Sequence, residues 1–347
     1  MRKMLMLGAA LLFCVGAEAQ TNSYTASNIV TNTTDPHLVN PWGLSRSLTK
    51  SVGNNGRWWV SDEVTGLSTL YDANGNIVDL TVTIPPASAA GTGSPTGTAA
   101  YGITPRNVNF AFATRDGTIS YWNSQTLPSP PGVGCAKCHV TTATIMVNNS
   151  ASNASYQGLT IATNATSGAA TFYAANANGG IEAYDAASFA PVTLATGAFK
   201  DPKIPTTYSP AGIQAIGSKI YVTYNAIAGG TGYVDAYGTN GKLLFRLETG
   251  WFNRPWGVAL APASFGAFSS MILVGNTGSG WIGAYDATNG RFQGFLEDSS
   301  GAELTLPGLW GIEFGNGSAD SGPTNVLYFN AGGAELTTGI FGSITAN

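Results

Sequence analysis

Charged residues and histidine are scarce in this chain, and their scarcity excludes several classes of function. Only 10% of the 347 residues are Asp, Glu, Lys or Arg, and the two histidines are His37 and His139. Binding to nucleic acid depends on clusters of Lys and Arg, which the sequence does not contain. Neither histidine lies near a Gly-x-Ser-x-Gly turn, and no Gly-x-x-x-x-Gly-Lys-Ser/Thr phosphate loop is present. The sequence therefore supports neither nucleic-acid binding nor serine hydrolysis.

Long apolar segments are also few, and the one at the start of the chain is too short to span a bilayer. Arg2 and Lys3 precede an apolar run from Leu5 to Gly16, and Ala17-Glu18-Ala19 follows as a small-x-small cleavage site. These features are typical of a secretory signal peptide. We therefore expect residues 1–19 to be removed, no membrane span, and a secreted or periplasmic protein.

Glycine is abundant instead, with 45 residues, and it recurs in a motif that appears six times. Each copy joins a glycine to a following aliphatic residue, and short alternating segments separated by turns come after it. The six copies are Asn40-Pro41-Trp42-Gly43-Leu44, Ala100-Tyr101-Gly102-Ile103, Tyr156-Gln157-Gly158-Leu159, Pro210-Ala211-Gly212-Ile213, Arg254-Pro255-Trp256-Gly257-Val258 and Gly308-Leu309-Trp310-Gly311-Ile312. The sequence thus predicts one four-stranded unit used six times.

A closed ring gives both faces of every such unit a neighbour. The predicted fold class is therefore all-β: a six-bladed β-propeller with four-stranded antiparallel blades around a central channel. The segment from Tyr24 to Thr31 alternates like a strand but belongs to no complete repeat, so we expect it to complete the last blade and close the ring. Residues 20–347 then form one domain, with blades near 38–85, 95–149, 155–202, 207–250, 252–298 and 303–345.

The repeat pattern of Pro-x-Gly-aliphatic, then aromatic-Val-x-Asp/Asn, then Tyr-Asp-x-x-Gly resembles NHL repeats. The leader, the paired Asn-Pro-Trp-Gly and Arg-Pro-Trp-Gly motifs and the ending Gly339-Ile340-Phe341-Gly342-Ser343 are similar to an uncharacterised family of secreted bacterial six-bladed propellers. The resemblance implies a fold and export. It supplies no reaction and no catalytic residues.

Polar residues follow the second predicted strand of the repeats, where the loops of a propeller converge on one channel mouth. They are Asp62, Glu63, Asn176, Asn225, Asn276 and Asn330. Their oxygens would suit Ca²⁺ or another hard cation. A resemblance to gluconolactonase-like and regucalcin-like propellers implies the same, although the metal-binding motifs of those proteins are not matched. The alternative is that Asn and Asp occur here because tight turns favour them.

Three tryptophans, Trp42, Trp256 and Trp310, occupy the same position in their repeats. They are candidates for an aromatic rim that stacks on sugar rings or other planar ligands, since amphipathic rings are common at binding surfaces. The alternative is packing between blades, which symmetry alone can explain.

Two cysteines remain after removal of the leader, in Cys135-Ala136-Lys137-Cys138-His139. This is the C-x-x-C-H spacing of c-type haem attachment. It lies in an insertion rich in Pro and Gly, without a helical segment to cover a haem. A disulfide or structural thiol pair, a haem c site and a metal site are therefore all left open.

The sequence thus predicts a secreted binding or interaction module whose partner is an unknown small molecule, glycan or protein. One alternative is a metal-dependent hydrolase of the lactonase type at the channel mouth. Another is an electron carrier with haem on the C-x-x-C-H motif.

Overall fold

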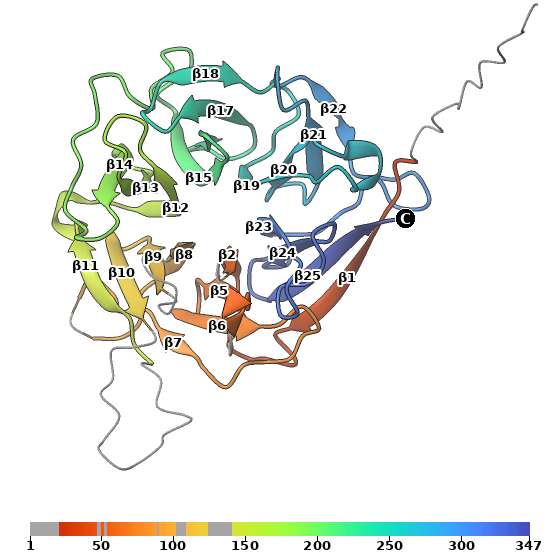
Figure 1. The fold of residues 1–347 in the computed structure, drawn as a ribbon, viewed down its shortest axis with the longest axis horizontal. Coiled ribbons are helices and arrows are strands. Elements are labelled where there is room, and N and C mark those ends of the chain that lie inside the picture. The colour runs from red at the N-terminus through yellow and green to blue at the C-terminus, as the bar shows by residue number, and fades with distance from the viewer. Residues whose placement is uncertain (1–20, 47–49, 52–53, 89, 102–108, 124–140) are drawn as a thin grey trace, which may run out of the picture.

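The computed structural model describes residues 21–46, 50–51, 54–88, 90–101, 109–123 and 141–347. Six antiparallel sheets radiate from a common centre, as Figure 1 shows. The chain is therefore a six-bladed β-propeller, and the predicted fold class is confirmed. Helical structure in the described ranges consists of two short 3-10 turns, η1 (Ser150–Ser152) and η2 (Gly266–Phe268).

The first three blades are given from the channel outward. Blade 1 contains β2 (Pro41–Arg46), β5 (Trp58–Asp62), β6 (Leu67–Tyr71) and β7 (Val82–Thr83). Blade 2 contains β8 (Pro95–Tyr101), β9 (Asn109–Thr114), β10 (Thr118–Asn123) and β11 (Thr144–Asn148). Blade 3 contains β12 (Tyr156–Thr163), β13 (Ala170–Asn176) and β14 (Gly180–Asp185). A separate two-stranded sheet pairs β3 (Lys50–Ser51) with β4 (Asn54–Asn55).

The other three blades each have four strands. Blade 4 contains β15 (Tyr208–Ile216), β16 (Lys219–Ala226), β17 (Gly232–Gly238) and β18 (Leu243–Arg246). Blade 5 contains β19 (Pro255–Leu260), β20 (Ile272–Asn276), β21 (Ile282–Tyr285) and β22 (Phe292–Phe295). Blade 6 contains β23 (Leu309–Phe314), β24 (Leu327–Ala331), β25 (Ile340–Ala346) and β1 (Tyr24–Thr31).

The ring closes inside blade 6, where the first strand of the chain pairs with the last. β1 runs antiparallel to β25, from Tyr24 opposite Ala346 to Thr31 opposite Ile340 (Figure 1). The predicted closure by residues 24–31 is confirmed. Its effect is to join the two ends of the ring through backbone hydrogen bonds rather than through side-chain packing alone.

The apolar core lies between the blades. Leu273 of blade 5 packs with Leu309 and Phe329 of blade 6, and all three are fully buried. Because a neighbouring blade covers each face, the second strands are mostly buried; every residue of β5 and β20 is buried. Such strands read as continuous apolar runs rather than as alternating ones.

Six glycines of the innermost strands bring consecutive blades into contact at the channel. A Cβ on Gly158 would stand 2.8 Å from the carbonyl oxygen of Ala211 in the next blade, and one on Gly311 would stand 2.8 Å from that of Trp42. The ring of close contacts runs through Gly43, Gly97, Gly158, Gly212, Gly257 and Gly311. Glycine recurs at this position because any side chain would push two blades apart.

The repeat assigned to the second blade was wrong. Its contact glycine is Gly97, at the start of β8, whereas the sequence motif placed it at Gly102. Gly102 and Ile103 lie outside the described residues. Thr98 follows Gly97 where the other copies have an aliphatic residue, so the glycine-aliphatic motif does not mark this copy and occurs instead five positions later.

Blade 3 also departs from the predicted four strands. Beyond β14 only one isolated bridge forms, between Tyr184 and Pro191. Val192 still donates its backbone N–H to the carbonyl of Ala183 at 2.8 Å. The start of β14 therefore has no strand beside it on its outer edge.

No helix of the described chain has the length and hydropathy of a membrane span.

Candidate functional site

Innermost strands begin, and second strands end, on the same face of the ring, which we call the entry face. Pro41 pairs with Asp62 in blade 1, and Pro255 pairs with Asn276 in blade 5. In blade 3 the innermost strand pairs in the same way with Asn176. The backbone register thus places Asp62, Asn176 and Asn276 in one equivalent position of their blades.

Two of the candidate residues are displaced from that position by one residue. In blade 4 Pro210 pairs with Tyr224, so Asn225 follows one residue later. In blade 6 Ala331 takes the equivalent position, so Asn330 comes one residue earlier. Because successive side chains on a strand point to opposite sides, these two do not join the others in one cluster.

Asn330 illustrates the consequence. It is completely buried, and its Nδ2 donates to the carbonyl oxygen of Gly43 at 3.0 Å. This hydrogen bond ties blade 6 to the innermost strand of blade 1. The side chain therefore braces the ring and does not face a channel mouth.

Asn176 and Asn276 hold the turns of the entry face. Asn176 accepts the backbone N–H groups of Ser155 and Asn178 on its Oδ1, both at 3.0 Å. Asn276 accepts the N–H of Asn253 at 2.9 Å and donates to the carbonyl of Trp281 at 3.2 Å. Their oxygens already have partners, which favours the turn-bracing interpretation of these residues.

Asp62 is a fully buried carboxyl at the end of β5. Its Oδ2 accepts a hydrogen bond from the Thr69 hydroxyl at 2.8 Å, and its Oδ1 is buried without a hydrogen-bond partner. Burial raises the pKa of Asp62 well above its ordinary value; the Thr69 hydroxyl lowers it and the negative charge of Asp35 raises it further. The environment thus favours the neutral carboxylic acid over a metal-binding carboxylate.

Glu63 is paired with a cation of the protein itself. Arg115 Nη1 lies 3.0 Å from Glu63 Oε1, and Asn40 Nδ2 lies 2.9 Å from Oε2. A guanidinium beside the carboxylate repels a second cation. In the described ranges no three His, Cys, Asp or Glu side chains form a group suited to a metal ion. The residues present do not fit the hypothesised calcium site.

The three tryptophans meet over the channel. The rings of Trp42 and Trp310 are stacked with centroids 3.7 Å apart, and Trp256 meets both edge-on at 6.2 and 6.0 Å. All three are at most 9% exposed. Trp256 Nε1 donates across the channel to the carbonyl of Gln157 at 3.0 Å. They pack against one another and leave no open aromatic rim.

The channel beneath this tryptophan cluster is narrow. A cavity lined by four of the contact glycines, Gly43, Gly97, Gly257 and Gly311, has a volume of about 20 Å³, which is room for about one water molecule. This cavity between the described residues is therefore too small for an organic ligand. Cys135, Cys138 and His139 lie outside the described residues, so their disulfide, haem and metal hypotheses stay predictions.

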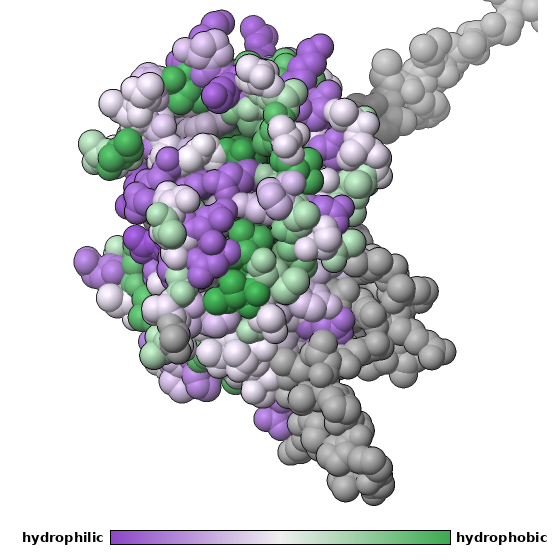
Figure 2. Space-filling model, turned by 90° about the vertical axis from the view of Figure 1, so that its left-hand side faces the viewer, coloured by the Kyte–Doolittle hydropathy of each residue, from purple (hydrophilic) through white to green (hydrophobic). Residues whose placement is uncertain are grey.

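A larger pocket of about 500 Å³ opens on blade 3 and was not predicted. Polar residues form one half of its lining: Asn149, Ser152, Asn176, Asn178, Glu182 and Tyr184. Apolar residues form the other half: Ile181, Ala183, Pro191, Val192 and Leu194. In Figure 2, which views the molecule from the side where β14 lies, hydrophobic and hydrophilic areas border one another.

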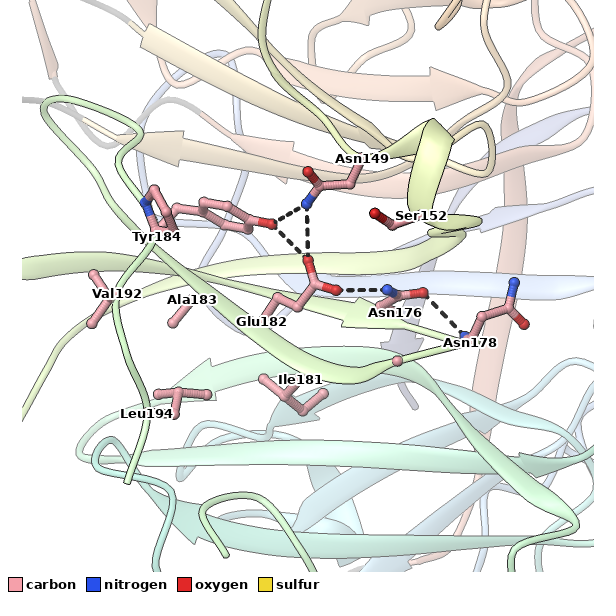
Figure 3. Close-up of a pocket in the computed structure, with 12 residues that line it drawn as sticks. Asn149, Ser152, Asn176, Asn178, Ile181, Glu182, Ala183, Tyr184, Val192 and Leu194 are labelled. Atoms are coloured by element: carbon pink, nitrogen blue, oxygen red, sulfur yellow. Dashed lines mark hydrogen bonds between the residues drawn. The ribbon is translucent and has the colours of Figure 1, made fainter. Parts of the chain in front are cut away.

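The carboxylate of Glu182 lies at the centre of the polar half, as Figure 3 shows. Its Oε2 accepts hydrogen bonds from the hydroxyls of Tyr156 and Tyr184, each at 2.6 Å, and from Asn149 Nδ2 at 3.3 Å. Its Oε1 accepts one from Asn176 Nδ2 at 2.6 Å. Four neutral donors therefore hold one negative charge in a fixed position.

The pocket depends on the missing fourth strand of blade 3. An ordinary outer strand would cover Ile181 and Glu182, whereas the segment 191–194 pairs with β14 only at Pro191 and Val192 and then forms the other wall of the pocket. Sequence reasoning missed the site because Glu182 was treated as one residue of a repeated strand. One signal was available: blade 4 has another carboxylic acid, Asp235, at the corresponding position, but blade 5 has Gly283 there, so the fold does not require a charge.

No protein-family model matches the sequence. An uncharacterised protein of Acanthamoeba polyphaga mimivirus is 29% identical over 337 residues, covering 91% of this chain and 83% of the relative. Another uncharacterised protein of the same virus is 27% identical over 335 residues, covering 90% and 76%. These relatives carry no assigned activity.

Solved structures resemble the chain in fold alone. A glucose dehydrogenase has a TM-score of 0.58 at 13% identity, covering 93% of this chain and all of that one. A Bacteroides thetaiotaomicron protein of unknown function has a TM-score of 0.56 at 12% identity, covering 93% and 76%. The PQQ-bound aldose sugar dehydrogenase of Streptomyces coelicolor has a TM-score of 0.52 at 12% identity, covering 94% and 100%.

Proposed function

We propose that this chain is an exported six-bladed β-propeller that acts as a binding module and takes a small organic molecule into the blade 3 pocket. One observation carries the proposal: a pocket of about 500 Å³ combines a polar half with an apolar half. This volume is within the range of small-molecule sites, which are mostly apolar with a few fixed polar groups.

The position of the pocket supports the same function. Asn149 precedes β12, and Asn178 lies in the turn between β13 and β14, so the opening is on the entry face. Loops on a rigid scaffold commonly carry binding residues. By contrast, the cavity beneath the tryptophan cluster, among the described residues, holds only about 20 Å³.

Export is supported by the leader, with its basic start, short apolar run and Ala17-Glu18-Ala19 site. The family resemblance adds a secreted bacterial protein with NHL-like repeats, whereas the relatives reported above are viral. Expression with the leader intact tests this part. If the measured mass corresponds to a mature protein that begins at Gln20, export is supported. Retention of the leader contradicts export.

The metal-dependent hydrolase of the lactonase type has less support. The sugar dehydrogenases named above are similar in fold alone. Asn176 Oδ1 and Asn276 Oδ1 already accept hydrogen bonds within the turns of the entry face. A calcium titration separates the two functions, since an ion that binds the native state raises the melting temperature. A saturable rise in melting temperature that Asp62→Asn abolishes would restore the hydrolase hypothesis.

The haem c alternative has its own test. A covalent haem mass on the peptide containing Cys135 and Cys138 would favour electron transfer as the function.

The binding module is tested by blocking the pocket. Ser152→Trp places a large ring at its exposed rim, and Ser167→Trp places the same ring in the exposed turn between β12 and β13, on the opposite face of the same blade. A panel of small amines, sugars and carboxylic acids is screened by thermal shift against both variants and the parent. We expect at least one compound to stabilise the parent and Ser167→Trp but not Ser152→Trp. Equal responses from all three proteins would place binding elsewhere and reject the pocket.

A further inference from the structure

Glu182 carries a negative charge that no cation among the described residues neutralises. Burial alone would raise the pKa of its carboxyl, but the hydrogen bonds from Tyr156, Tyr184, Asn176 and Asn149 outweigh burial and hold the pKa below its ordinary value. The side chain is therefore ionised at neutral pH. Among the described residues, the ion pairs formed by Lys, Arg and His do not include Glu182.

The four donors leave one direction open. Three of them converge on Oε2, which is thereby saturated, whereas Oε1 accepts only from Asn176. A carboxylate oxygen accepts about two hydrogen bonds. Oε1 can therefore accept one more, from a donor inside the pocket. Neutral donors fix the carboxylate without cancelling its charge, so a positively charged donor gains most from this position.

The apolar half of the pocket lies beside this charge. Figure 3 shows Ile181 and Leu194 below Glu182, with Val192 and Ala183 next to them. This wall can cover a short hydrocarbon chain, and each buried CH₂ group contributes about 0.8 kcal/mol. The negative charge of Glu182 would repel an anion. A fully polar molecule would make no apolar contact with this wall.

We propose that the blade 3 pocket binds a small primary ammonium ion with a short apolar tail, its nitrogen on Glu182 Oε1 and its tail against Ile181, Val192 and Leu194. The inference rests on the proposed binding function and adds the chemical class of the ligand. The ammonium donates one hydrogen bond to the open position of Oε1. The charge of the ligand, rather than its shape, is what distinguishes it from a neutral alcohol of equal length.

The test compares hexylammonium with 1-hexanol, which shares the tail and lacks the charge. Binding to the full mature chain is measured by calorimetry for the parent and for Glu182→Gln, which keeps the size of the side chain and removes its charge. A hydrogen bond to a charged group contributes about 1.5–3 kcal/mol, or roughly 10- to 150-fold in Kd. The reference is the affinity of the parent for hexylammonium. We expect hexanol to bind the parent at least about tenfold more weakly than this. We expect the same loss for hexylammonium binding to Glu182→Gln.

A second variant keeps the test decisive if Glu182→Gln does not fold. Leu194→Asn removes part of the apolar wall and leaves the carboxylate in place. It should weaken hexylammonium and leave the weaker binding of methylammonium unchanged. The affinity for hexylammonium in the parent should stay constant from pH 8 to pH 5 and fall only below the ordinary glutamate pKa of 4.5, because the ionised form is the one that binds.

Failure of the inference differs from failure of the proposed function. Equal affinities for hexylammonium and hexanol, or an unchanged affinity in Glu182→Gln, would overturn the ammonium ligand. So would the absence of any binding by hexylammonium. If another class of compound is then excluded by Ser152→Trp, the pocket is still a binding site for different chemistry. If Ser152→Trp excludes no compound, both proposals fail.

Discussion

Asp62 links burial inside the ring to the pH dependence of stability. Its carboxyl is fully buried, with Oδ1 unpartnered and Asp35 near enough to add to the cost of ionisation. Since its pKa is raised in the folded chain, the native state binds a proton that the unfolded state has already released. The stability that depends on this proton is complete below the ordinary pKa of 3.8 and is lost as the pH rises toward the folded value.

The parent should therefore lose stability as the pH rises, and Asp62→Asn should be free of this loss. We expect the free energy of unfolding of the variant to rise relative to the parent between pH 4 and pH 7, by at most about 1.4 kcal/mol per pH unit for one proton. Urea unfolding across this range measures the difference. Asp286→Asn provides a contrast, because the hydroxyl and backbone N–H of Thr288 lower the pKa of Asp286. That variant should be less stable than the parent at neutral pH, and the difference should vanish in acid. A pH-independent difference for Asp62→Asn would show that its carboxyl is ionised in the native state.

At the scale of strands, the repeat pattern predicted the elements well because its signals are local. Alternation and turn glycines mark where strands begin and end, and the sequence predicts the closing strand at Tyr24 to Thr31, where β1 lies. Register is set by pairing between distant segments. The one-residue displacements of Asn225 and Asn330 arise there, and a one-residue shift turns a side chain to the opposite side.

The blade 3 pocket could not be predicted for a related reason. The sequence from Ala190 to Leu194 contains Val and Leu at strand-like spacing, yet only Pro191 bridges to β14. Proline has no backbone N–H, so it weakens any ladder of hydrogen bonds at this edge. The sequence records that proline, but where the displaced segment runs depends on packing against blade 4, where Val192 and Leu194 contact the buried cluster around Ile220 and Tyr237.

Removal of β1 tests the closing element. Deleting residues 20–32 from the mature chain takes away the outer strand of blade 6 and exposes the edge of β25. Tyr24 and Val30 are both buried, and burial of one large apolar side chain contributes about 1.5–3 kcal/mol. We expect the free energy of unfolding to fall by at least about 3 kcal/mol, measured by urea unfolding.

A milder variant separates packing from strand pairing. Tyr24→Phe keeps the ring stacked near Phe268 but removes the hydroxyl, which donates to the carbonyl of Phe265 at 3.1 Å and accepts from the Phe268 N–H at 3.1 Å. This variant should lose about 1 kcal/mol. If the deletion lowered the free energy of unfolding no more than Tyr24→Phe does, pairing of β1 with β25 would not be what closes the ring.

At the scale of the whole molecule, the ring has no required starting point. The start of the described chain lies beside Asn347, since the Asn347 N–H donates to the carbonyl of Ser23 at 3.0 Å. A short glycine linker from Asn347 to Thr21 would therefore permit new termini elsewhere. The ladder between β16 and β17 contains seven residue pairs, as does the present seam between β1 and β25.

Two circular permutants should consequently differ in stability although their sequences are almost the same. Opening the chain at Gly229-Gly230, an exposed turn inside blade 4, leaves β16 and β17 to close the ring as a new ladder. Opening it at Thr249-Gly250, between blades 4 and 5, leaves a seam with side-chain packing and no shared sheet. We expect the first permutant to melt within a few degrees of the parent and the second to melt clearly lower, by differential scanning calorimetry. Equal melting temperatures would mean that packing between blades holds the ring by itself, and that the strand exchange in blade 6 serves folding order rather than stability.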